Sequence, residues 1–219
     1  RKLVSFTVGG CSAINELPAR KKDNAASAPV RDTYKEIWDF IDSRHPRSTD
    51  PGRIVIPRSF AVSEWACLLA TFLARLGLPV HVDNVVASDL ADAQPLFSVD
   101  TCAPHMGAVG QYRRLAGEPH GLILAPQIEA LPTDGKSTGH TCTLNQGGVA
   151  VAVNLARLAH PEARFLLFNV DLSTLEPEAL RIQFELHLQP LFRRHGLAPG
   201  SDMVRAAAAA AVDEHRRLC

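Results

Sequence analysis

The chain has 219 residues, 46% of them hydrophobic, and its 23 basic and 23 acidic side chains leave no formal net charge. This length and composition are enough to bury a substantial core, whereas the balanced charge argues against nucleic acid as a partner. No apolar run reaches the roughly 20 residues that a membrane-spanning helix needs. We therefore expect neither a nucleic-acid nor a membrane partner.

The two ends of the sequence bear on where the protein acts. Its first residues lack the long apolar stretch and small-residue cleavage site of a secretory signal. The chain starts at Arg1 rather than at methionine, and it ends at Cys219 directly after a predicted helix. We therefore expect a cytoplasmic protein and interpret the sequence as a piece of a longer chain.

The apolar pattern divides the chain into two sections. The first, residues 1–50, contains a predicted strand over 2–8, a loop with a polar linker, and an amphipathic helix over 31–45. The second, residues 51–219, alternates short apolar runs, typical of buried strands, with amphipathic helical stretches. The four strands expected in it lie at 53–57, 78–85, 121–128 and 163–172, and two further helices follow the last of them.

This alternation predicts an α/β fold of the Rossmann-like class, in which parallel strands are joined by right-handed crossovers. One helix is expected over residues 63–77, with Ser63 as its N-cap and Gly77 as its stop. In open parallel sheets, ligands bind outside the carboxyl ends of the strands. Cys102 and Cys142 each stand where a loop gives way to a helical pattern, so we expect both thiols at that edge.

The five cysteines are an odd number in a chain without a secretory signal, which argues against a disulfide framework. Cys67 lies among large apolar residues and is interpreted as a small buried hydrophobe. Cys11 follows two glycines, which either let the backbone approach an inorganic group or make a tight turn. The spacing contains no Cys-x-x-Cys pair, so a structural zinc site is poorly supported. For Cys102 and Cys142, ordinary loop thiols, metal ligands and a nucleophile remain open.

Two neighbouring sequence features suggest other chemistry. His105 and His140 lie within three residues of Cys102 and Cys142, so either could act as the base for a cysteine nucleophile, although no orienting third group is evident. The stretch "ALPTDGKST" ends like a phosphate-binding loop, but Ala130 replaces the first glycine of that motif. We therefore expect no ATP site on this chain, and ATP would bind elsewhere in a longer chain or on a partner.

Three short sequence elements follow one another along the chain: Ile-Pro-Arg at residues 56–58, Cys-x-Pro at 102–104 and Cys-x-x-x-Gln at 142–146. Together with "SFTVGGCSAINELP" near the start, they resemble the region shared by 2-hydroxyacyl-CoA dehydratases and the related CoA-substrate-specific enzyme activases. The dehydratases have proline directly after the second cysteine, where this chain has Thr143. The activase-like branch is therefore the closer match.

The resemblance implies an iron–sulfur protein. In the dehydratases, thiolates on such loops hold [4Fe–4S] clusters that receive an electron from an ATP-hydrolysing activator. By resemblance, Cys102, Cys142 and, as a third ligand, Cys11 would hold a cluster here. The partner would be a dehydratase or activase subunit, with acyl-CoA as a candidate ligand. The alternatives are a cluster-less scaffold of the same system and a cysteine hydrolase.

Overall fold

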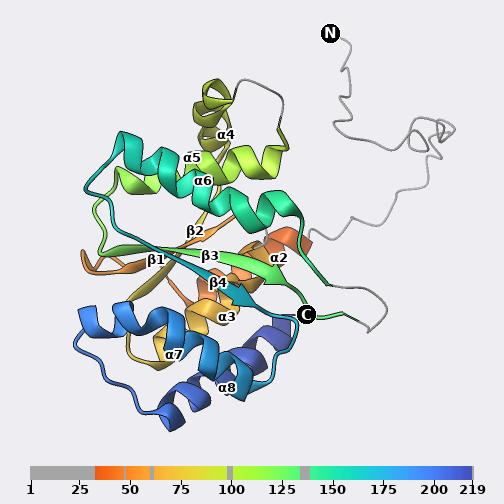
Figure 1. The fold of residues 1–219 in the computed structure, drawn as a ribbon, viewed down its shortest axis with the longest axis vertical. Coiled ribbons are helices and arrows are strands. Elements are labelled where there is room, and N and C mark those ends of the chain that lie inside the picture. Colours follow the sequence, from red (N-terminus) through yellow and green to blue (C-terminus); the bar gives the residue numbers. More distant parts are fainter. Residues whose placement is uncertain (1–32, 47, 60–61, 98–100, 134–138, 219) are drawn as a thin grey trace, which may run out of the picture.

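The structure, a computed structural model, describes residues 33–46, 48–59, 62–97, 101–133 and 139–218 (Figure 1). The strands are β1 (Ile54–Arg58), β2 (Val80–Asn84), β3 (Leu122–Ala130) and β4 (Phe165–Asp171). The helices are α2 (Thr33–Arg44), α3 (Val62–Arg75), α4 (Ala87–Ala93), α5 (Ala103–Ala116), α6 (Thr143–Ala159), α7 (Pro177–Arg194) and α8 (Ser201–Leu218), with a 3₁₀ turn, η1 (Gln94–Leu96), after α4. The α/β prediction is confirmed, since helices flank an all-parallel sheet.

The strands follow the order β2-β1-β3-β4. The chain moves from β1 to β2 in one direction and then, through β3 and β4, in the other. Helices α4, α5 and α6 cover one face of the sheet, and α3, α7 and α8 cover the other (Figure 1). The topological switch point therefore lies between β1 and β3, at whose carboxyl ends a doubly wound sheet binds its ligands.

The central strands are buried on both faces, as parallel strands between two helical layers must be. Ile54 and Ile56 of β1 join the core under α3, α7 and α8, while Val55 between them joins the smaller core under α5 and α6. In β3, likewise, Leu124 joins the larger core and Ile123 joins the smaller one. This alternation explains why the strands are continuous apolar runs in the sequence.

The sequence predicted the end of α3 correctly but not its start. Gly77 follows the helix with a φ of 76°, a left-handed conformation that glycine adopts without strain, so its predicted role as a stop is confirmed. Helix α3 begins at Val62, however, so Ser63 lies inside the first turn and the prediction of Ser63 as N-cap was wrong. The Ser63 carbonyl instead accepts a hydrogen bond from Arg58 Nε at 3.0 Å.

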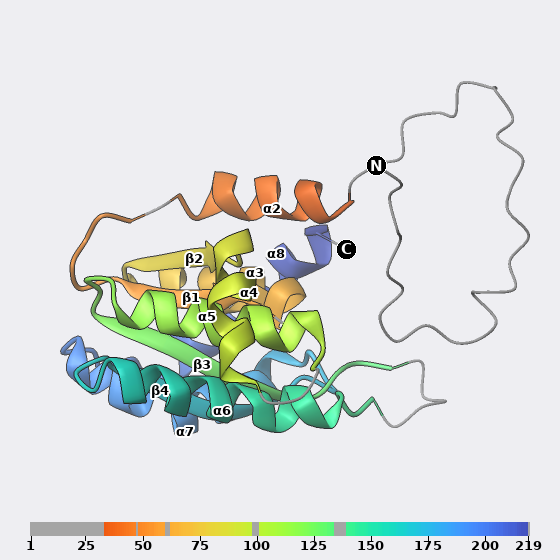
Figure 2. The same ribbon diagram turned by 90° about the horizontal axis from the view of Figure 1, so that it is seen from above.

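Helix α2 matches the amphipathic helix predicted before residue 50. Its Ile41 is buried in the larger core, and Arg44 forms an ion pair of 3.4 Å with Glu214 of α8. Figure 2 shows α2 on the β2 side of the sheet, opposite β4. The strand predicted at residues 2–8 lies outside the described residues. Within the part that the structure describes, none of the helices combines the length and apolarity needed to span a membrane.

Candidate functional site

Two cysteines occupy equivalent positions at the starts of neighbouring helices. Cys102 is the N-cap of α5 and Cys142 is the N-cap of α6, and both have extended backbone conformations. The carbonyl of each cysteine accepts hydrogen bonds from the N–H groups three and four residues later, at 2.8–3.1 Å. Neither thiol bonds to its own helix as a cap. Neither thiol is therefore needed to cap its helix.

The two helix starts lie at the same edge of the sheet. Helices α5 and α6 run side by side on one face, and both begin at the carboxyl ends of the strands (Figures 1 and 2). Gly148 of α6 packs so closely on His105 of α5 that a Cβ there would lie 2.7 Å from the imidazole ring. This contact joins the first turn of α5 to the second turn of α6. Cys102 is half-buried and Cys142 is exposed.

The start of α6 is braced by hydrogen bonds to the end of β3. Asn145 Nδ2 donates to the Ile128 carbonyl at 3.0 Å, and Thr141 Oγ1 donates to the same carbonyl at 2.6 Å. The Gln146 side chain donates to the Thr141 carbonyl at 2.8 Å, and Gln127 donates to the Gln146 carbonyl. Gln146, the last residue of the Cys-x-x-x-Gln element, therefore has a local structural role. It helps to hold the loop that carries Cys142 against the sheet.

The donor set fits part of an iron–sulfur ligand shell. Thiolates are the usual ligands of such clusters, and N–H groups directed at the sulfurs help to set their potential. The first N–H groups of a helix have no partner within it and favour negative charge nearby. Across the described residues, however, no three His, Cys, Asp or Glu side chains gather closely enough to hold a metal ion. A cluster here would need ligands beyond Cys102 and Cys142.

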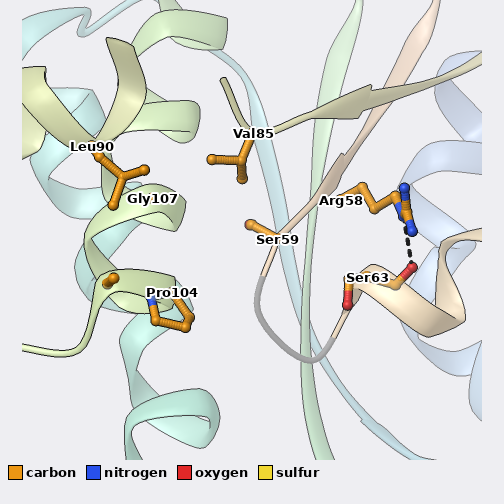
Figure 3. A pocket seen from close by; sticks show the side chains of 8 residues that line it. Arg58, Ser59, Ser63, Val85, Leu90, Pro104 and Gly107 are labelled. Carbon is orange, nitrogen blue, oxygen red and sulfur yellow. Dashed lines mark hydrogen bonds between the residues drawn. The ribbon is translucent and has the colours of Figure 1, made fainter. Parts of the chain in front are cut away.

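A cavity of about 360 Å³ opens beside the Cys102 end of α5 (Figure 3). Its walls come from the ends of β1 and β2, the start of α3, α4 and the first turns of α5. The lining residues are Arg58, Ser59, Ser63, Val85, Leu90, Ala103, Pro104 and Gly107. Ala103 and Pro104 directly follow Cys102, so the cavity lies beside the first turn of the helix that Cys102 begins. Sequence reasoning missed this cavity, because its walls come from five separate elements.

Arg58 closes the end of β1 and is only 1% exposed. Besides its bond to Ser63, it donates to Asn84 Oδ1 at 3.3 Å, and its guanidinium lies 5.8 Å from the centre of the Trp38 ring. It therefore ties together β1, β2, α2 and α3. In Figure 3 its side chain runs toward Ser63 and its head group lies away from Pro104 and Gly107. The arginine of the Ile-Pro-Arg element thus holds together the elements that form one wall of the cavity.

An ionic cluster centred on Arg114 holds α4 and α5 to the end of β2. Arg114 bonds to Asp83 Oδ1 at 2.6 Å, to Asp89 Oδ1 at 2.8 Å and to Glu118 Oε1 at 3.2 Å. Burial disfavours the charged guanidinium, but the hydrogen bonds to Asp89 and Asp83 outweigh it and raise the pKa of Arg114. No spacing signal in the sequence could reveal this cluster, since Arg114 and Asp83 are 31 residues apart.

The candidate bases for a cysteine nucleophile have different surroundings. His105 is 5% exposed, with its ring centre 5.5 Å from that of Phe97 in an edge-on arrangement, and burial lowers its pKa. His140 is exposed and pairs through its backbone with Ala130. Cys67 is fully buried in α3, under the opposite face of the sheet from α5, so its interpretation as a core residue is confirmed.

The structure thus brings two of the three predicted ligands, Cys102 and Cys142, to the starts of adjacent helices. The third, Cys11, lies outside the described residues, as do Cys219 and the lysine of the rejected phosphate loop, Lys136. Comparisons with protein-family models, with curated proteins and with solved structures found no match for this chain.

Proposed function

We propose that this chain is a cytoplasmic iron–sulfur module of an acyl-CoA dehydratase and activase system, with a [4Fe–4S] cluster held partly by Cys102 and Cys142. One observation carries the proposal: the two thiols cap adjacent helices at the carboxyl edge of the sheet. The short elements that resemble the dehydratase and activase region coincide with these positions. Cys11 or a partner subunit would supply the ligands that the described residues lack.

A bound cluster would supply one-electron chemistry at low potential. The residues of this chain would fix its position and its surroundings. Asn145 and Gln146 hold the Cys142 loop against β3, and the packing of His105 on Gly148 fixes the spacing of the two helices. The N–H groups of Ala103, Thr143 and Leu144, at the two helix starts, would donate to the cluster sulfurs, whereas Pro104 has no N–H to offer. ATP would be hydrolysed by the partner.

Anaerobic purification followed by iron and acid-labile sulfide analysis tests the proposal. We expect both elements in roughly equal amounts, about four of each per cluster, with an absorbance band that bleaches on reduction. Mixing with an ATP-dependent activator should then reduce the cluster. Protein that contains neither element, both as purified and after reconstitution with iron and sulfide, would contradict the proposal and favour the cluster-less scaffold.

A further inference from the structure

Among the residues that the structure describes, strand β4 forms an open edge of the sheet. In the order β2-β1-β3-β4 its one described strand neighbour is β3, and in Figure 1 it lies in front, between α6 and α7. The opposite edge strand, β2, shares a surface cavity with Asp42 and Pro46 from the α2 segment. The sequence of β4, FLLFNVD, contains neither the lysine nor the proline with which exposed edge strands commonly discourage pairing.

The hydrogen bonds along β4 show which of its backbone groups face outward. The Arg164 carbonyl accepts from Ile123 and the Leu172 N–H donates to Ala130, so the even-numbered residues bond toward β3. The odd-numbered residues, Phe165, Leu167, Asn169 and Asp171, therefore direct their N–H and C=O groups to the open side. At Asp171 the Gln183 side chain takes the place of a neighbouring strand, with bonds of 2.8 Å to both backbone groups.

We infer that β4 is a homodimer interface, in which it pairs antiparallel with β4 of a second copy about a two-fold axis at Leu167. This register opposes Leu167 to itself and Phe165 to Asn169 of the second copy. It uses all three outward residues that Gln183 leaves open. The two sheets would become one continuous eight-stranded sheet. Because the two Leu167 side chains would lie on the same face, their Cβ atoms would approach to about 5 Å.

Charge complementarity favours a second copy of this chain as the partner. The amino end of β4 is flanked by the exposed Arg157 and Arg164. The exposed Glu162 nearby offsets one of these two positive charges. Its carboxyl end carries the exposed Asp171, and beside it lies the exposed Glu129 of β3, which accepts a hydrogen bond from Asn169 Nδ2 at 2.6 Å. An antiparallel pair places each amino end beside the partner's carboxyl end, so unlike charges would meet twice. With no net charge on the chain, long-range repulsion between copies is small.

Helix α7 supplies apolar surface beside the same edge. Ile182 is 54% exposed and Leu186 is 70% exposed. Leu186 follows Gln183 by three residues, so it lies on the side of α7 that reaches the end of β4. A two-fold axis perpendicular to the sheet would bring α7 against α7 of the second copy. Burying these side chains would add to the strand pairing.

Sedimentation velocity of the full chain in reducing buffer tests this inference, which does not depend on the cluster. We expect a particle of twice the 23.7 kDa chain mass. Leu167→Lys should give a monomer, because two ammonium groups would face each other at the axis. Leu158→Lys is the matched control: Leu158 is 81% exposed on α6 and should leave the dimer intact. A monomeric parent, or a dimer that survives Leu167→Lys, would overturn the inference.

A cross-linking variant covers the case in which Leu167→Lys fails to fold. The Cα atoms of directly opposed, hydrogen-bonded residues lie about 5.5 Å apart, and their Cβ atoms, about 5 Å apart, are too distant for an unstrained disulfide. Leu167→Cys should therefore form a covalent dimer with a short bifunctional thiol reagent, well above the level of the parent and of Leu158→Cys. Equal cross-linking in all three proteins would contradict pairing at Leu167.

Discussion

Replacing Arg114 by methionine should destabilise the fold by about 2–4 kcal/mol, somewhat below the range for a fully buried ion pair, because the Arg114 side chain is 26% exposed. Asp89 is 1% exposed, and the Asp83 side chain is 14% exposed. Methionine keeps much of the side-chain volume but leaves both carboxylates without their main cation. Because the ionic cluster around Arg114 joins β2, α4 and α5, its loss should loosen the helical layer that carries Cys102. Urea denaturation at neutral pH measures the change.

Two controls separate buried charge from charge in general. Arg205→Met removes ion pairs with Glu178 and Asp202 in which all three side chains are at least half exposed, and it should change stability little. Combining Arg114→Met with Asp89→Asn should recover part of the loss, since an amide oxygen can still accept the bond from the Val86 N–H. If Arg114→Met and Arg205→Met lowered the free energy of unfolding equally, the ionic cluster around Arg114 would contribute no more to stability than a surface ion pair.

Gly110→Ala should also be strongly destabilising, although alanine is the better helix former by about 1 kcal/mol. A Cβ at Gly110 would lie 1.8 Å from the carbonyl oxygen of Asp89, and that oxygen belongs to the backbone of α4. Helices α4 and α5 would have to separate, which would also strain the bonds between Asp89 and Arg114. We expect a net loss of about 3 kcal/mol or more, at the upper end of overpacking effects.

Gly147→Ala is the matched control for this substitution. Gly147 is also helical, in α6, and nothing lies within 4 Å of a Cβ placed there. The same change should therefore stabilise the protein by about 0.5–1 kcal/mol. Thermal unfolding of the two variants should give shifts of opposite sign. A Gly110→Ala variant as stable as the parent would show that α4 does not contact α5 at this point.

Sequence patterns predicted best the features that depend on local conformation or on uniform burial. Strand β1 is a continuous apolar run because both of its faces are covered, and Gly77 is needed for its left-handed turn. Helix α5 begins at Ala103 with Pro104 in its first turn, a position where proline is favoured. The carboxyl-edge rule placed Cys102 and Cys142 correctly on one edge, since it depends only on chain order.

Features that depend on strand order or on contacts across the chain were not predictable. Strand β4 reads as a buried strand, and only the order of the sheet makes it an edge. The contact of Gly110 with Asp89 and the bonds of Arg114 depend on how α4 meets α5. The cavity beside Cys102 depends on the same packing. Local patterns carry no information about such distances, because the residues involved belong to separate elements.

The iron content of cysteine variants tests the central claim most directly. After anaerobic reconstitution and desalting, Cys102→Ser and Cys142→Ser should each retain several-fold less iron per chain than the parent, with little change in far-ultraviolet circular dichroism. Cys67→Ser should retain the parent's iron while losing stability, because it places a hydroxyl in the core at a fully buried position. Iron content that is equal in the parent and all three variants would contradict cluster ligation by Cys102 and Cys142.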